Sequence, residues 1–219
     1  MLKSKKNVFW EALVITIAIF AIGLFLGITI ETSNLSKISE FYTKSEIALV
    51  DGMAITTLSE EINISCDFLR EENIKFANKI YEEAKLLEEY EAQGKITDNM
   101  ILLHQKYDLL RTLLWLSNQD SLIRCENYDL IVYLYEYNTE DIQKQATQNV
   151  WSKILLDIRS TNENLLLIPI ATDQNLTSLN LLMNKYGIDS YPAVIVNNRK
   201  VIYALENIDT INPYLGQFN

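Results

Sequence analysis

Two cysteines, Cys66 and Cys125, carry the side chains best suited to covalent or redox chemistry in this chain of 219 residues. A cysteine thiolate is a nucleophile and a redox group, whereas a cysteine joined to a second one is a covalent cross-link. An even number of cysteines in an exported chain favours the cross-link. We therefore predict a structural Cys66–Cys125 disulfide. A redox-active pair and two free thiols are the alternatives.

Metal and acid–base chemistry receive little support from the sequence. His104 is the single histidine, so a metal centre with histidine ligands is not expected. The acidic stretch 81–91 (YEEAKLLEEYE) offers carboxylates, but they point in several directions around a helix, as on a solvated surface. No glycine-rich phosphate loop, G-x-S-x-G or H-E-x-x-H pattern occurs. We expect no metal, no other cofactor and no catalytic residue.

The charge of the chain bounds its partners. There are 19 basic and 29 acidic residues, which gives a formal net charge of −10. Proteins that neutralise phosphates need a basic surface, so nucleic acid is not an expected partner. We interpret the acidic surface as a means of keeping the chain soluble.

An apolar run near the N-terminus predicts a membrane anchor in the lipid bilayer. Residues 12–30 include no charge and no proline, and a helix of that length spans roughly 28 Å, close to the hydrocarbon thickness. A signal peptide is the alternative, but the run is long for one and no small-residue cleavage site follows. Lys3, Lys5 and Lys6 precede the run, which places the N-terminus in the cytoplasm. Gly23 and Gly27 have the spacing that lets membrane helices pair closely, so a homodimer is a further hypothesis.

The middle of the chain, residues 35–125, is predicted to be helical. Apolar periodicity indicates helices over about 38–58, 65–92 and 97–124, and the glycine of Gln93-Gly94-Lys95 separates the last two. We expect the first helix to continue the membrane helix as a stalk and the other two to form an antiparallel hairpin. Lys95, at the turn, is 29 residues after Cys66 and 30 residues before Cys125. Equal distances from the turn place the two cysteines opposite each other.

Residues 128–219 alternate between strands and helices. Runs of β-branched and aromatic residues predict the strands, and capping residues and apolar periodicity predict the helices. The expected order is strand 129–135, helix 138–160 with its cap at Asn138 or Thr139, strand 165–171, helix 176–186, a strand hairpin from 193 that turns at Asn197-Asn198, and a short helix at 209–217. The first two strands should pair in parallel, and the hairpin should add antiparallel strands.

This order resembles the thioredoxin superfamily. The resemblance is carried by Lys185-Tyr186-Gly187-Ile188, then Tyr191-Pro192 and the strand hairpin, and it implies an α/β thioredoxin-like fold with the family's cis-proline at Pro192. The family's oxidoreductases have CxxC at the start of the helix after the first strand. Here that stretch is residues 137–142, YNTEDI, which contain no cysteine. The resemblance therefore implies a domain without the redox motif.

The family's mode of substrate binding supplies the functional expectation. In that mode the backbone beside the cis-proline pairs with an extended polypeptide, so Pro192 and Tyr191 predict a groove for a protein or peptide partner. Tyr135 and Tyr137 are its expected aromatic walls. A proline that serves only the architecture of the loop is the alternative.

Three N-x-S/T triplets begin at Asn34, Asn63 and Asn175, and they are either glycosylation acceptors of an exported chain or chance occurrences. Asn175 is also a predicted helix cap.

Together these patterns predict a cytoplasmic tail (1–7), a transmembrane anchor (8–31), a helical stalk and hairpin (35–125) and a thioredoxin-like domain (128–219). We expect a single-pass protein of the cell membrane with an extracytoplasmic C-terminal domain, which acts in protein interaction or as a subunit of an envelope complex. The alternative is a thiol–disulfide oxidoreductase that uses the two cysteines.

Overall fold

The computed structural model of the chain describes residues 5–61, 64–92, 98–119, 125, 128–204 and 208–216. They belong to two compact units, Met1–Thr43 and Lys44–Asn219. The helical hairpin and the sheet described below share the second unit.

A long helix, α1 (Lys5–Glu61), contains the apolar run. In the described part of the chain, Phe9–Ile30 is the one segment long and apolar enough to cross a membrane, and it is exposed along its length. This is compatible with a membrane anchor or a signal sequence. Thr16 and Thr29 each donate a hydroxyl hydrogen bond to the carbonyl four residues earlier, at 2.9 and 2.7 Å, so the helix itself satisfies these polar groups.

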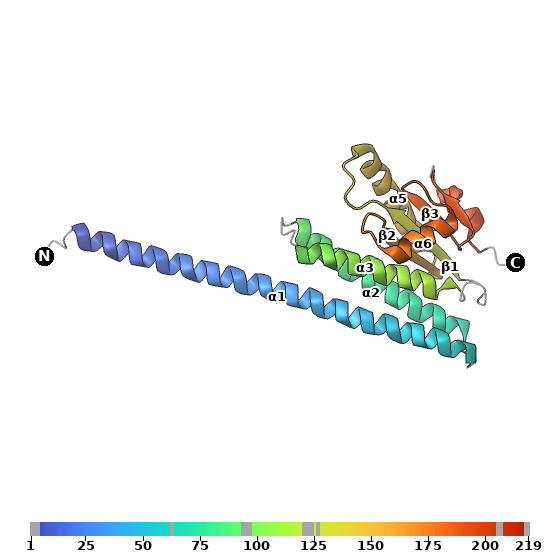
Figure 1. Ribbon diagram of the computed structural model, residues 1–219, viewed down its shortest axis with the longest axis horizontal. Coiled ribbons are helices and arrows are strands. Elements are labelled where there is room, and N and C mark those ends of the chain that lie inside the picture. Colours follow the sequence, from blue (N-terminus) through green and yellow to red (C-terminus); the bar gives the residue numbers. More distant parts are fainter. Residues whose placement is uncertain are drawn as a thin grey trace. The chain divides into compact units, whose positions relative to one another are not determined.

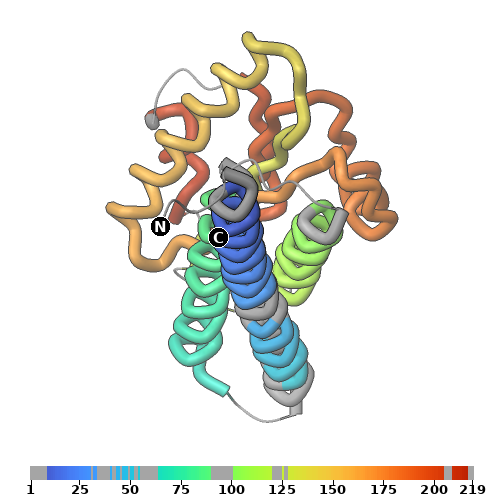
Figure 2. Tube along the Cα trace, turned by 90° about the vertical axis from the view of Figure 1, so that its left-hand side faces the viewer, coloured from blue at the N-terminus to red at the C-terminus, as the bar shows by residue number. Residues whose placement is uncertain are grey.

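The predicted hairpin is formed by α2 (Cys66–Ala92) and α3 (Asp98–Ser117), which lie side by side in Figure 1 and are the teal and green helices of Figure 2. α3 ends at Ser117, and residues 120–124, which include the predicted end near Arg124, lie outside the described residues. Asn118, the residue after Ser117, explains the end of α3 there. Its side chain donates to the Leu114 carbonyl at 2.8 Å and accepts from the Tyr128 hydroxyl at 2.6 Å, and such side-chain bonds compete with helix continuation.

The second unit is built on a mixed four-stranded sheet with the order β2-β1-β3-β4 (Figure 1). β1 pairs in parallel with β2 and antiparallel with β3, and β3 pairs antiparallel with β4. The elements are β1 (Asp129–Tyr135), α5 (Ile142–Thr161), β2 (Leu165–Ala171), α6 (Thr177–Tyr186), β3 (Ala193–Val196) and β4 (Lys200–Ile202). The predicted strands and their pairing are confirmed.

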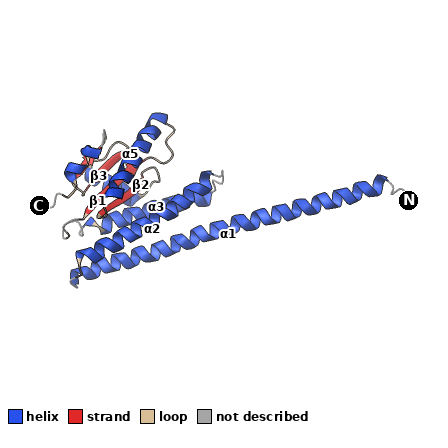
Figure 3. Ribbon diagram, turned by 180° about the vertical axis from the view of Figure 1, so that it is seen from behind, coloured by secondary structure: helices blue, strands red, loops and turns tan. Residues whose placement is uncertain are grey.

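Helices cover both faces of this sheet (Figure 3). On one face, Ile131 and Tyr133 of β1 pack with Trp151 and Leu155 of α5 in a buried core, as the alternation of side chains along a strand requires. On the other face lies α6, which contacts α3. The hairpin helices α2 and α3 both contact the edge strand β2.

The chain after β4 differs from the prediction. Instead of one helix over 209–217, it forms two short 3₁₀ turns, η1 (Ile208–Thr210) and η2 (Asn212–Tyr214). Pro213 lies in the second turn and has no N–H to donate to a longer helix. Ile211, between the turns, is fully buried in the core beside α5.

The β3–β4 turn matches its prediction in detail. Asn197 and Asn198 have φ angles of 49° and 55°, which asparagine tolerates better than most residues. The Asn197 side chain also accepts from the Leu130 N–H at 2.7 Å and donates to Asp129 at 2.8 Å. Asn198 accepts from the indole N–H of Trp115 in α3 at 2.7 Å. The β3–β4 turn therefore links the sheet to α3 of the helical hairpin.

The outer edge of β2 is closed to further strand pairing at two positions. Thr172 donates its N–H towards β1, to the Tyr135 carbonyl at 2.8 Å. The N–H of the preceding residue, Ala171, points the other way and is bound by the Asp108 carboxylate at 3.1 Å. Pro169, two residues earlier on the same edge, has no N–H. Neither Ala171 nor Pro169 can therefore donate a backbone hydrogen bond to an added strand, which protects this edge from further pairing.

Candidate functional site

The loop that follows β1 is held by side chains from two elements. The Asp173 carboxylate, just after β2, accepts from the backbone N–H groups of Tyr137 and Asn138 at 3.1 and 2.7 Å. The buried amide of Gln148 in α5 accepts from the N–H of Glu136 at 2.8 Å and donates to its carbonyl at 2.9 Å. These bonds fix the backbone at the carboxyl end of the parallel strands.

The start of α5 is later than predicted, and its cap is Asp141 rather than Asn138 or Thr139. The Asp141 side chain accepts from the N–H groups of Gln143 and Lys144, and the helix begins at Ile142. The physical reason is that the backbone N–H of Asn138 donates to Asp173, which keeps the residues before Ile142 in a loop. The Asp141 carboxylate thus occupies backbone donors that an anion or a thiolate would use at this helix start, and Asp173 occupies two donors of the preceding loop.

The Tyr191–Pro192 peptide bond is cis, as the resemblance implied. Ala193, the next residue, pairs with Leu134, so Pro192 lies at the carboxyl end of β1. The Tyr191 hydroxyl donates to the sulfur of Met183 in α6 at 2.9 Å, which directs this side chain towards α6.

A cleft of about 510 Å³ opens beside this loop, between α2 and α5, a volume typical of binding pockets. Its floor comes from alternate residues of β1 and from Pro169 of β2, and its walls come from the two helices. The lining residues are Tyr81, Ala84, Lys85, Glu88, Arg111, Tyr133, Tyr135, Glu136, Tyr137, Gln145, Gln148, Asn149, Ser152 and Pro169.

Two tyrosines form the floor, Tyr133 buried and Tyr135 partly buried. The rings of Tyr133 and Tyr135 stack at 5.4 Å, and Trp151 stacks on Tyr133 at 6.2 Å. The Tyr133 hydroxyl donates to the Gln148 carbonyl at 3.0 Å. Burial raises the pKa of both phenols, so both stay protonated and neutral at physiological pH.

A buried ion pair lies behind the floor. The Asp108 side chain is 2% exposed, and it accepts from Arg111 at 3.1 Å as well as from Ala171. Burial raises the pKa of the Asp108 carboxyl, although the positive charge of Arg111 opposes the shift. Burial also lowers the pKa of Arg111, but Asp108, Tyr135 and Glu88 raise it overall, so the guanidinium stays charged. Arg111 thereby presents a donor group at the cleft.

The predicted site residues do not all meet at this cleft. Tyr135 and Tyr137 line it, and the Tyr137 ring packs on His104 at 4.5 Å. Tyr191 and Pro192 are not part of its lining, and the Tyr191 hydroxyl is bound to α6. The four residues lie at the same end of β1, on two separate surfaces.

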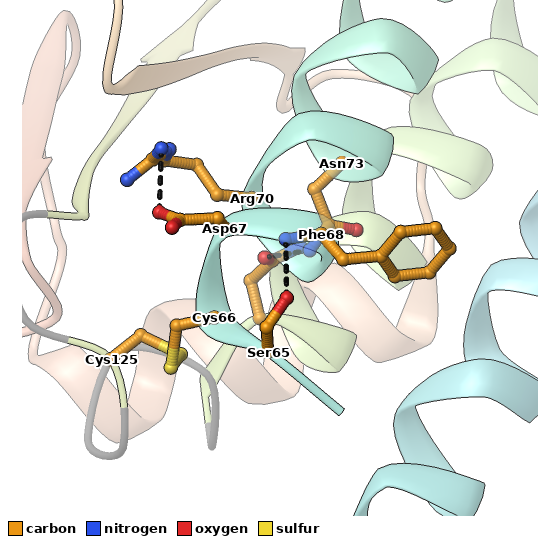
Figure 4. The surroundings of a disulfide bond; sticks show 8 residues. Ser65, Cys66, Asp67, Phe68, Arg70, Asn73 and Cys125 are labelled. Carbon is orange, nitrogen blue, oxygen red and sulfur yellow. Dashed lines mark hydrogen bonds and ion pairs between the residues drawn. A yellow bond between two sulfur atoms is a disulfide. The ribbon is translucent and has the colours of Figure 1, made fainter. Parts of the chain in front are cut away.

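The predicted Cys66–Cys125 disulfide is confirmed, with Cα atoms 5.4 Å apart (Figure 4). It joins the start of α2 to the segment before β1, and Cys125 is 4% exposed. Ser65 accepts from the Phe68 N–H at 3.3 Å beside it. Pro192 lies at the opposite end of β1, and a strand of seven residues is roughly 23 Å long.

The remaining predicted sites are isolated. Asn175 is exposed with a φ of 55°, and the α6 cap is Leu176, so the predicted capping role of Asn175 is wrong. Asn63 lies outside the described residues, and Asn34 lies within α1. Side chains placed at Gly23 or Gly27 would meet open space. The described residues contain no cluster of three or more metal ligands.

Sequence reasoning missed most of the cleft. Gln145, Asn149 and Ser152 are uncharged polar residues at helical spacing, a signal that is visible in the sequence of α5. Nothing in the sequence showed that this stripe faces Tyr81 and Arg111 of the hairpin.

The chain matches no family model, no curated protein and no solved structure.

Proposed function

We propose that this protein is a membrane-anchored, extracytoplasmic member of the thioredoxin superfamily that binds polypeptides noncovalently and has no redox activity of its own. The observation that carries the proposal is the strand order β2-β1-β3-β4 with Pro192 directly before β3. In the family, this loop and the start of the helix after the first strand form the substrate site.

The local chemistry supports binding rather than catalysis. The helix start that would hold redox cysteines has the cap Asp141 instead, which accepts from the N–H groups of Gln143 and Lys144, and Asp173 binds the N–H groups of the loop before it. Both cysteines are used in a disulfide at the other end of β1. The backbone around Pro192 and the tyrosine-lined cleft remain as surfaces for a partner.

The anchor and its orientation belong to the same proposal. A helix of 22 residues at Phe9–Ile30 is sufficient for a membrane span, and the lysines before it favour a cytoplasmic N-terminus. A disulfide suits the oxidising side of the membrane.

An insulin-reduction assay on the full-length protein in detergent tests the absence of redox chemistry. We expect no turnover above the buffer control, both for the wild type and for Cys66→Ser/Cys125→Ser. Turnover that the double substitution abolishes would establish the rival function, a thiol–disulfide oxidoreductase.

Binding of reduced, carboxymethylated lactalbumin, a permanently unfolded polypeptide, tests the positive half of the proposal. We expect Tyr191→Arg to weaken binding about tenfold, because it places a charged side chain beside the cis-proline loop. Val150→Arg is the control, since Val150 is an exposed residue of α5 and not of the loop before β3. No binding by the wild type, or equal losses in both variants, would refute the proposal.

A further inference from the structure

The walls of the cleft have the dimensions of a short extended segment. The lining residues of each helix are three or four residues apart, so they share one face of the helix. They are Tyr81, Ala84, Lys85 and Glu88 on α2 and Gln145, Gln148, Asn149 and Ser152 on α5. Seven residues of helix measure roughly 10 Å. A polyproline II helix rises about 3.1 Å per residue, so the cleft accommodates three to four residues, about one turn of such a segment.

The charges around the cleft cancel. Arg111 is paired with Asp108 at 3.1 Å and Glu136 with Lys144 at 2.7 Å, and the remaining lining charges, Lys85 and Glu88, are opposite. A lining without net charge gives no long-range attraction to a phosphate, a basic peptide or a metal ion. The ligand that fits this lining is uncharged.

Hydrogen-bond donors remain available on the α5 wall. The side chains of Asn149 and Ser152 are exposed and make no hydrogen bond within the described residues. Across from them lie the ring of Tyr81 and, on the floor, Tyr135 and Pro169. A polyproline II segment has carbonyls without internal partners and flat pyrrolidine rings, so it needs such donors and aromatic surfaces.

A β-strand is the less suitable conformation for the same segment. Strand addition to β2 needs outward N–H groups on that edge, but the N–H of Ala171 is bonded to Asp108 and Pro169 has none. A polyproline II segment can bind without a ladder of backbone hydrogen bonds to a strand. Its proline residues have no backbone N–H, so they need no hydrogen-bond acceptor.

From these observations we propose that the cleft between α2 and α5 binds an uncharged, proline-rich segment of a partner protein in the polyproline II conformation. The inference rests on the proposed function, because it adds a second contact surface to a protein proposed to bind polypeptides. It assigns the contact to the cleft, a surface distinct from the one that carries Tyr191.

The test measures fluorescence anisotropy of labelled decaproline with the full-length protein in detergent. A glycine–serine decapeptide with the same label is the control ligand, and unlabelled maltohexaose is the competitor that represents a neutral sugar. Asn149→Arg places a charge in the cleft, and Asn180→Arg makes the same change on the exposed face of α6. Neither substitution removes a buried contact, so both variants should fold.

We expect decaproline to bind at least about tenfold more tightly than the glycine–serine peptide. Asn149→Arg should weaken it by about tenfold, and Asn180→Arg should leave it within about twofold. Equal affinity for the two peptides, indifference to Asn149→Arg, or displacement by maltohexaose would each overturn the inference. If lactalbumin binding still depends on Tyr191 in that event, the proposed function stands and only the assignment of the cleft fails.

Discussion

Removal of the disulfide is the perturbation with the clearest expected magnitude. Cys66 and Cys125 are 59 residues apart in sequence, so the bond closes a long loop of the unfolded chain. In the chain-entropy model, a loop of that length contributes about 4 kcal/mol to stability. Cys66→Ala/Cys125→Ala is the cleaner variant, because serine would place a hydroxyl in the buried environment of Cys125.

Fluorescence-monitored unfolding in guanidinium chloride measures this loss. Trp115 and Trp151 are both buried in the second unit, whereas Trp10 lies in the apolar segment. A Trp10→Phe background therefore restricts the signal to the unit that contains the disulfide. We expect the double-alanine variant to lose about 4 kcal/mol and to show a larger m-value, because its unfolded chain exposes more surface.

Two results would refute this reasoning. A loss below about 1 kcal/mol would mean that the cross-link hardly restricts the unfolded chain. Two titratable thiols in the unfolded wild type, without reductant, would mean that the bond is not formed. The wild type with excess dithiothreitol is the control, and it should match the variant.

Three further substitutions test contacts around the site by denaturant unfolding in the same background. Gln148→Met removes both bonds to the Glu136 backbone and should cost about 2–3 kcal/mol, less if water reaches the loop. Asn198→Gly keeps the positive φ but leaves the buried Trp115 indole N–H without its acceptor, and should cost about 1–3 kcal/mol with altered tryptophan fluorescence. Burial raises the pKa of Asp108, so the contribution of this carboxyl to stability falls as the pH rises from about 3.9 through the raised pKa. Asp108→Asn should abolish that part of the pH dependence of stability above about pH 4. An identical pH profile for the wild type and Asp108→Asn would contradict this account.

Several features of the second unit could be predicted from the sequence because they depend on neighbouring residues. The strands β1 to β3 follow from runs of β-branched and aromatic residues. Gly187 ends α6 with a φ of 64°, and Asn197 adopts a positive φ in the turn, as their residue types indicate. The disulfide was also predictable, because the positions of Cys66 and Cys125 relative to the hairpin turn depend only on counting residues.

Element ends were predicted less well where a distant partner competes with the local pattern. The α5 cap moved to Asp141 because Asp173, after β2, binds the loop before the helix. The end of α3 depends on Asn118, whose side chain meets Tyr128 and Asn73. These bonds join residues far apart in the chain, so capping patterns within a short window do not reveal them.

The amino-acid sequence alone determined the apolar N-terminal helix, the order of strands and helices, the partner of each cysteine and the absence of a thiol at the start of α5. Only the tertiary structure decided that α2 lies against the edge strand β2 opposite α5, and thereby created the cleft with Tyr135 at its floor and Arg111 beside it. The physical reason is that a cleft is the space left between elements packed by contacts distant in sequence, whereas helices, strands and turns are set by periodicity and backbone preference within a few residues.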